Sequence, residues 1–144
     1  MEFVKECLDI LDLMYTDLDD GSVGVSFFDE EVFPHQIITL IRITNDNALS
    51  FSSHSPEYHP QGDLYFLANR HNCRSHSPAC HITEEGAVVM DRVFNLEVEV
   101  SPHYILEDVI RPSMYLPLEA FANFELDDDE LQRRMDNLDN SAES

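Results

Sequence analysis

The chain of 144 residues carries 29 acidic and 8 basic residues, which gives it a formal net charge of -21. With 43% hydrophobic residues it is long enough for one domain with a single core and too short to expect two. A surface with this excess of acidic residues repels phosphate backbones and anionic lipid headgroups, so direct binding to nucleic acids or membranes is disfavoured. A basic or neutral partner is favoured instead.

Most of the acidic residues lie near the two ends of the chain. The N-terminal sequence MEFVKECLDI has acids where a secretory signal has lysines, and no apolar run reaches the length of a membrane-spanning helix. Three cysteines without framework spacing are typical of a reducing compartment, so we expect a cytoplasmic protein. We also expect a domain over residues 1–124 and an acidic tail at 125–144, either a short helix capped by Asp127 or a disordered end.

The first half of the chain predicts one helix and three strands. Apolar residues recur at intervals of three and four from Phe3 to Tyr15, and the turn formers of DLDDGS end this helical pattern. Residues 23–31, 35–44 and 48–53 then have strand-like composition and alternation. The middle run is hydrophobic on both faces, which is typical of a central strand covered on both sides. An antiparallel meander is the simplest arrangement.

The second half predicts a helix, a hairpin and a closing helix. LYFLANRHN (64–72) has a helical pattern, whereas ACHIT (79–83) and residues 88–100 form a hairpin that turns near Gly86. Ser101 as N-cap and Pro102 at the first helical position begin the last major helix. Pro112 is expected to break or sharply kink this helix, and Pro117 constrains any continuation. The expected fold is α+β, an antiparallel sheet with helices packed on it, in the order α-βββ-α-ββ-α.

This element order resembles that of the YbjN family, whose fold is similar to class I type III secretion chaperones. The resemblance is carried by LANRHN (67–72), the hairpin TEEGAVVMDRVFNL (83–96) and the closing helix SPHYILEDVI (101–110), and it extends to about Phe124. It implies a small α+β domain, commonly dimeric, that binds protein segments without a catalytic apparatus or cofactor. The chaperone mechanism is an expectation by analogy of fold.

The segment HNCRSHSPACH (71–81) concentrates metal-ligating residue types. A zinc site could use His71, Cys73, His76 and Cys80 if RSHSP loops back, although their spacing is not that of the common zinc motifs. His81 is adjacent to Cys80, so in a strand the two side chains point to opposite faces. The alternative is that Cys80 or His81 is an ordinary buried side chain. A nucleophilic Cys80 with a histidine base lacks a visible third group to orient the base.

No nucleotide-binding or hydrolase motif is present, and the paired carboxylates are typical of solvated turns and faces. We therefore expect a non-enzymatic, chaperone-like or regulatory protein-binding module without a cofactor. It would act as a homodimer and present an acidic surface to a basic or neutral client, at a sheet edge that accepts an extended strand. Two alternatives remain open: a small zinc-binding protein that uses residues 71–81, and an acidic nucleic-acid mimic.

Overall fold

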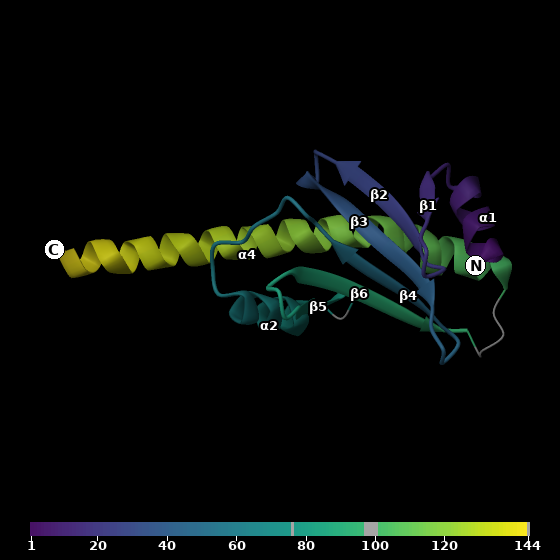
Figure 1. The fold of residues 1–144 in the computed structure, drawn as a ribbon. Helices are drawn as coiled ribbons and strands as arrows, with labels where there is room; N and C mark the ends of the chain where they lie inside the picture. Colours follow the sequence, from purple (N-terminus) through teal and green to yellow (C-terminus); the bar gives the residue numbers. More distant parts are fainter. Residues whose placement is uncertain (76, 97–100, 144) are drawn as a thin grey trace.

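The computed structural model describes residues 1–75, 77–96 and 101–143. The strands are β1 (Tyr15–Asp17), β2 (Val23–Asp29), β3 (Phe33–Ile43), β4 (Ala48–His54), β5 (Ala79–Ile82) and β6 (Val88–Asn95). The helices are α1 (Glu2–Ile10), α2 (Leu64–Arg74), α3 (Pro102–Tyr104) and α4 (Arg111–Glu143), with a π-helical segment, η1 (Ile105–Ile110), between the last two. The six strands form one antiparallel sheet in the order β1-β2-β3-β4-β6-β5, which confirms the α+β class (Figure 1).

The sheet has one strand more than expected. The predicted first helix reached Tyr15, but α1 ends at Ile10, and Tyr15 begins β1 opposite Val25. Asp12 adopts a left-handed conformation with a φ of 58°, which ends the helical path. The last turn of α1 also lacks a basic residue to balance its dipole. A three-residue strand is too short for periodicity to separate it from the end of a helix.

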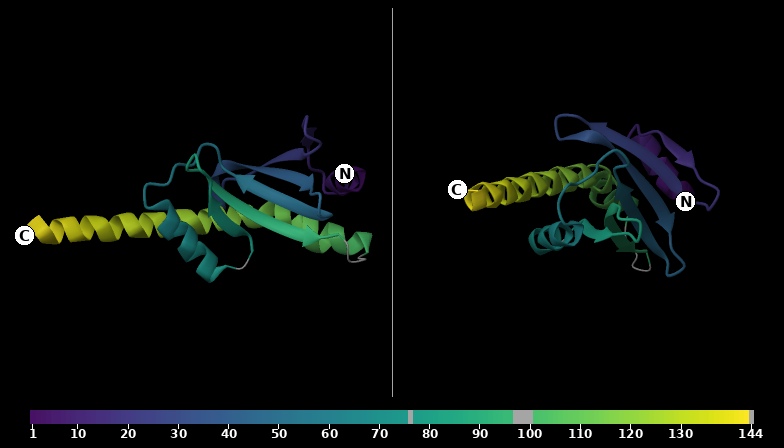
Figure 2. Two further views of the ribbon diagram at one scale, coloured as in Figure 1. Left: turned by 60° about the horizontal axis from the view of Figure 1, so that its bottom comes forward. Right: turned by 60° about the vertical axis from the view of Figure 1, so that its left-hand side comes forward.

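The helices cover one face of the sheet, and no element of the described residues covers the other (Figure 2). Alternate residues of β3 explain this arrangement: Phe33, Ile37 and Ile41 are fully buried towards the helices, whereas Ile38 and Leu40 are half-buried on the opposite face. The prediction that β3 is an inner strand is confirmed. The prediction that it is covered on both faces is wrong for the described part of the chain.

The closing helix runs through both prolines, so the predicted break at Pro112 is wrong. The chain is helical from Pro102 to Glu143, with Ser101 as the expected N-cap. Immediately before Pro112, the Arg111 amide donates to the Leu106 carbonyl five residues back. This wider π-type turn breaks the regular ladder at the point where proline offers no amide and would crowd a carbonyl four residues back. The Ser113 hydroxyl then donates to the Val109 carbonyl.

The acidic C-terminal segment belongs to the same helix. Residues 125–143 continue α4, whose 33 residues span about 50 Å, and the helix projects beyond the sheet (Figure 1). Asp127 therefore lies inside a helix and is not its N-cap. The neighbouring Asp128 is buried and accepts the backbone N–H groups of Gln61 (2.9 Å) and Gly62 (2.8 Å). A side chain at Gly62 would meet Asp128 Oδ1 at 2.9 Å and Leu131 Cδ2 at 2.8 Å, so a larger residue would require these two side chains to shift.

We predict that Asp128→Ala lowers the free energy of unfolding by about 2 to 3 kcal/mol, because two charge-assisted hydrogen bonds to the loop before α2 are lost together. Urea denaturation followed by circular dichroism measures the change. Asp129→Ala is the matched control at the next, exposed position, and its effect should stay within about 0.5 kcal/mol. Equal effects of the two substitutions would contradict this role of Asp128.

Candidate functional site

The residues predicted as zinc ligands do not come together in the described chain. His71 is buried on α2, with its Nε2 atom 2.9 Å from the Pro78 carbonyl oxygen. Cys73 is exposed at the end of the same helix, and Cys80 is buried in β5. His76 lies outside the described residues. No group of three or more histidine, cysteine or acidic side chains in the described part of the chain is arranged to hold a metal ion.

The same segment instead fastens α2 to the edge of the sheet. The Asn72 side chain donates to the Cys80 carbonyl (2.8 Å) and accepts the Cys80 N–H (2.7 Å). These are the outward-pointing backbone groups of β5, which an added strand would need. Asn72 therefore closes this edge in the way that proteins protect exposed strands from unwanted pairing. Sequence reasoning missed Asn72, because nothing local to LANRHN shows that its amide faces a strand eight residues later.

Two of the three thiols are unreactive by environment. Burial raises the pKa of Cys80 to about 12, with a smaller contribution from Asp91, and burial followed by Glu6 raises the pKa of Cys7. Both remain protonated at neutral pH, whereas a nucleophile or metal ligand must be a thiolate. The structure therefore gives no support to Cys80 as a nucleophile.

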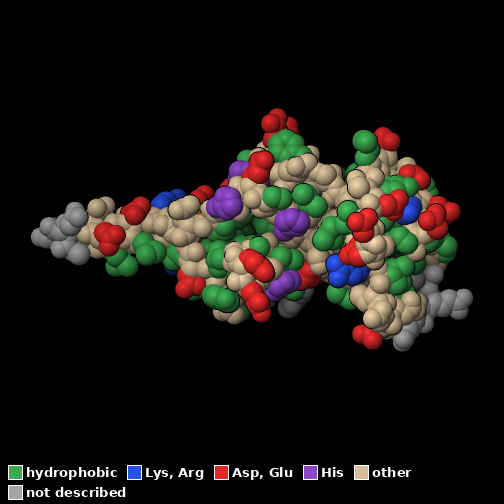
Figure 3. All heavy atoms as spheres, in the orientation of Figure 1, with side chains coloured by type: hydrophobic (Ala, Val, Ile, Leu, Met, Phe, Trp, Pro, Cys, Tyr) green, Lys and Arg blue, Asp and Glu red, His purple; other side chains and the backbone are tan. Residues whose placement is uncertain are grey.

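The uncovered sheet face extends across β2, β3, β4, β6 and β5. Across β2 to β6, strand register and alternating burial place these residues on it: Gly24, Ser26, Ile38, Leu40, Arg42, Ser50, Ser52, His54, Ala79, His81, Val89, Asp91 and Val93. We call this set the open face. Only Arg42 and Asp91 among these positions carry a formal charge, although the chain as a whole has a net charge of -21. Figure 3 views this side of the molecule, with histidines gathered over its left half.

A short polar chain crosses the open face. The Asp91 carboxylate accepts the Ser52 hydroxyl (2.7 Å) and pairs with His81 Nδ1 (2.5 Å). The carboxylate lies between the serine and the histidine, so His81 cannot take a proton from Ser52 in the manner of a catalytic triad. The arrangement fixes the His81 ring and leaves its Nε2 atom available to a bound partner.

The two sheet edges differ. Leu18 N–H bonds to the Ser22 carbonyl and Thr16 lies opposite Gly24, so the polar backbone groups of Gly24 point towards β1. By alternation those of Ser26 point the same way, yet β1 begins at Tyr15, opposite Val25. Beyond this point, the described part of the chain provides no strand next to β2. Phe28, 53% exposed, lies on this open stretch, which three acids follow in the sequence.

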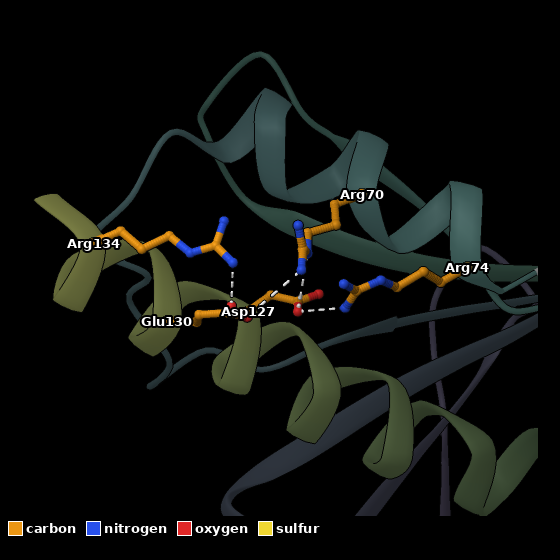
Figure 4. A network of polar contacts seen from close by, with 5 residues as sticks. All are labelled: Arg70, Arg74, Asp127, Glu130 and Arg134. Atoms are coloured by element: carbon orange, nitrogen blue, oxygen red, sulfur yellow. Dashed lines mark hydrogen bonds and ion pairs between the residues drawn. The ribbon is translucent and has the colours of Figure 1, made fainter.

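A network of arginines and acids joins α2 to the projecting part of α4 (Figure 4). Asp127, only 9% exposed, pairs with Arg70 (3.3 Å) and Arg74 (2.8 Å). Glu130 lies 3.6 Å from Arg70 and 2.6 Å from Arg134. The three arginines and two acids of this network leave one net positive charge, and their pairs hold the two helices together.

A cavity of about 290 Å³ lies where the loop after β4 meets the β5–β6 turn. His54, Tyr58 and Phe121 are among its lining residues. The Tyr58 ring packs edge-on against Phe33 and Phe121, with centroids 5.4 and 6.3 Å away, so this wall is rigid. Burial raises the pKa of the Tyr58 hydroxyl, with contributions from nearby acids of α4 led by Asp128, so the hydroxyl stays neutral at physiological pH.

Comparison with known proteins identifies no relative. The chain matches no family model, and neither a curated protein nor a solved structure is significantly similar to it. The resemblance to the YbjN family therefore stays a prediction. None of the helices in the described residues combines the length and the apolar character that crossing a membrane requires.

We predict that Asn72→Ala destabilises the fold by about 1 to 2 kcal/mol, since it removes both hydrogen bonds to Cys80. The freed edge of β5 should also increase self-association, measured by sedimentation at rising protein concentration. Cys73→Ala, one position further along the same helix, is the control and should change neither property. A stable, monodisperse Asn72→Ala protein would overturn the proposed edge closure.

Thiol modification gives a second prediction. In the native protein, Ellman's reagent should react with Cys73 alone, because Cys7 and Cys80 are buried and their pKa values are raised. All three thiols should react after unfolding in guanidinium. Mass spectrometry after alkylation identifies the modified residue. Rapid native modification of Cys80 would mean that β5 opens or that this thiol is activated.

Proposed function

We propose that this chain is a non-enzymatic, cytoplasmic protein-binding module of chaperone-like or regulatory kind, and that its client lies on the open face. One observation carries the proposal: the sheet leaves a broad face uncovered by the described residues, and only Arg42 and Asp91 among the open-face residues carry a formal charge, while the chain holds 29 acids. An uncovered sheet face that served only to meet solvent would be expected to carry charged side chains. Uncovered and uncharged surface is typical of a contact site.

The acids outside this face determine which clients approach. A net charge of -21 attracts a basic segment over a distance of about one Debye length and accelerates its encounter. Contact then comes from the aliphatic and small residues of the open face. The unpaired stretch of β2 that begins at Ser26 adds main-chain groups that an extended client strand can pair with. A basic, partly apolar, extended peptide is the ligand that these features favour.

The resemblance to the YbjN family further supports a chaperone-like fold and a homodimer. Native mass spectrometry tests the dimer, whose mass would be twice the 16.6 kDa of one chain. The same measurement before and after chelation tests the alternative of a bound zinc ion.

We predict that fluorescence anisotropy detects binding of a labelled peptide of alternating lysine and valine, and that an alternating glutamate–valine peptide does not bind. Raising the salt from 50 to 300 mM should weaken the complex, because surface charges are screened. If nucleic acid competes for a partner protein captured in a pull-down, that result favours the nucleic-acid mimic instead. If the lysine–valine peptide binds under none of these conditions, the proposal is contradicted.

A pair of double variants locates the contact. Val89→Thr with Val93→Thr keeps β-branched residues in β6 but replaces two methyl groups of the open face by hydroxyls, which should weaken binding about tenfold. Met135→Gln with Leu138→Gln is the control, since both residues are at least half-exposed on the projecting helix, away from the open face. Equal losses would show that the contact is not on the sheet.

A further inference from the structure

The cavity beside the open face has the position of a subsite for a bound peptide. Ser53 pairs with Met90, so the next residue along β4, His54, comes opposite Val89, which in turn pairs with His81. These three residues form one row across the open face. The row continues through Ile38 of β3 and Ser26 of β2, so His54, which also lines the cavity, lies in its middle. A chain that crosses the open face along this row therefore passes the cavity at His54.

The size and walls of the cavity suit one large side chain. Its volume of about 290 Å³ is at the lower limit for small-molecule and cofactor pockets, which occupy roughly 300–1,000 Å³. Its lining includes four rings: Pro56, Pro60, Tyr58 and Phe121. Flat, rigid walls of this kind favour an aromatic guest, because edge-to-face and offset contacts between rings add to the burial of apolar surface.

The charge at the cavity favours particular residues beside the aromatic side chain in the bound peptide. Glu85, on the β5–β6 turn, is the formally charged residue among the side chains that line it. Glu84 precedes it on the same exposed turn, and the whole chain is strongly acidic. Lysine or arginine beside the aromatic residue would therefore be attracted, whereas an acidic neighbour would be repelled.

We propose that this cavity is the anchor site for an aromatic side chain of a basic peptide bound on the open face. The inference rests on the proposed function and adds to it the sequence feature that a client must have. Clients with an aromatic residue flanked by lysine or arginine bind more tightly than equally basic clients without one.

Tryptophan fluorescence tests the proposal directly, because the chain contains no tryptophan and all indole emission comes from the ligand. The probes are three blocked peptides of the sequence Lys-Lys-X-Lys-Lys, in which X is tryptophan, phenylalanine or alanine. The tryptophan peptide should show saturable binding with a blue-shifted emission. Calorimetry should give affinities for both aromatic peptides about tenfold higher than for the alanine peptide.

Matched variants place the effect at the cavity. Ala87→Phe puts a ring at the cavity wall and should lower the affinity for the tryptophan peptide about tenfold, whereas Asn45→Phe, on the exposed β3–β4 turn outside the open face and the cavity, should not. Glu85→Lys should weaken binding more than Glu84→Lys, although both change the net charge equally. Thermal melting of each variant establishes that it is folded.

The outcomes separate this inference from the function on which it rests. Binding of all three peptides with equal affinity, unaffected by Ala87→Phe, would overturn the anchor site and leave the open face as a general peptide-binding surface. Failure of every basic peptide to bind would overturn the proposed function itself. An aromatic preference that survives in folded Ala87→Phe would place the anchor elsewhere and so refute this cavity.

Discussion

The continuity of the closing helix through its two prolines is the constraint on which the rest of the structure depends. The inward side of η1 and α4 carries Ile110, Leu118, Phe121 and Phe124, all at most 2% exposed, along both halves of the core. A break at Pro112 would separate the half that packs with α1 from the half that packs with α2. The π-type turn before Pro112 avoids this separation. One straight helix, however, can cover only one face of a sheet.

The distribution of charge follows from the same arrangement. Half of the eight basic residues lie at or near the junction of α2 and α4: Arg70, Arg74, Arg133 and Arg134. Three of them pair with Asp127 or Glu130, so much of the positive charge of the chain is neutralised locally. The acids elsewhere are left with few cations to balance them. The fastening of the second helix therefore concentrates basic residues at one place and leaves the acids elsewhere with few basic neighbours.

The sequence predicts what depends on local pattern and misses what depends on contacts between distant segments. Alternation located the main strands and the hairpin near Gly86, and the Ser-Pro capping signal located the helix start at Ser101. Asp127 has the residue type of an N-cap, but its partners on α2 lie more than fifty positions earlier in the chain. The Asn72–Cys80 pairing and the open face also depend on the register of the sheet. The even-numbered positions of β3 and β4 did carry a signal, since they hold small, aliphatic or neutral polar residues with a single charge at Arg42.

The open face carries few charges, and the acidic residues elsewhere on the chain affect which molecules approach it. An uncharged sheet surface normally promotes association between copies of the same protein, and unpaired edges add to that tendency. Here Asn72 closes one edge, and β1 covers only the first part of β2 at the other. The charge of -21 attracts basic segments over a distance, which is the kind of client that we propose for the open face. The acidic residues that surround the open face are therefore also the features that, under the proposed function, select a basic client.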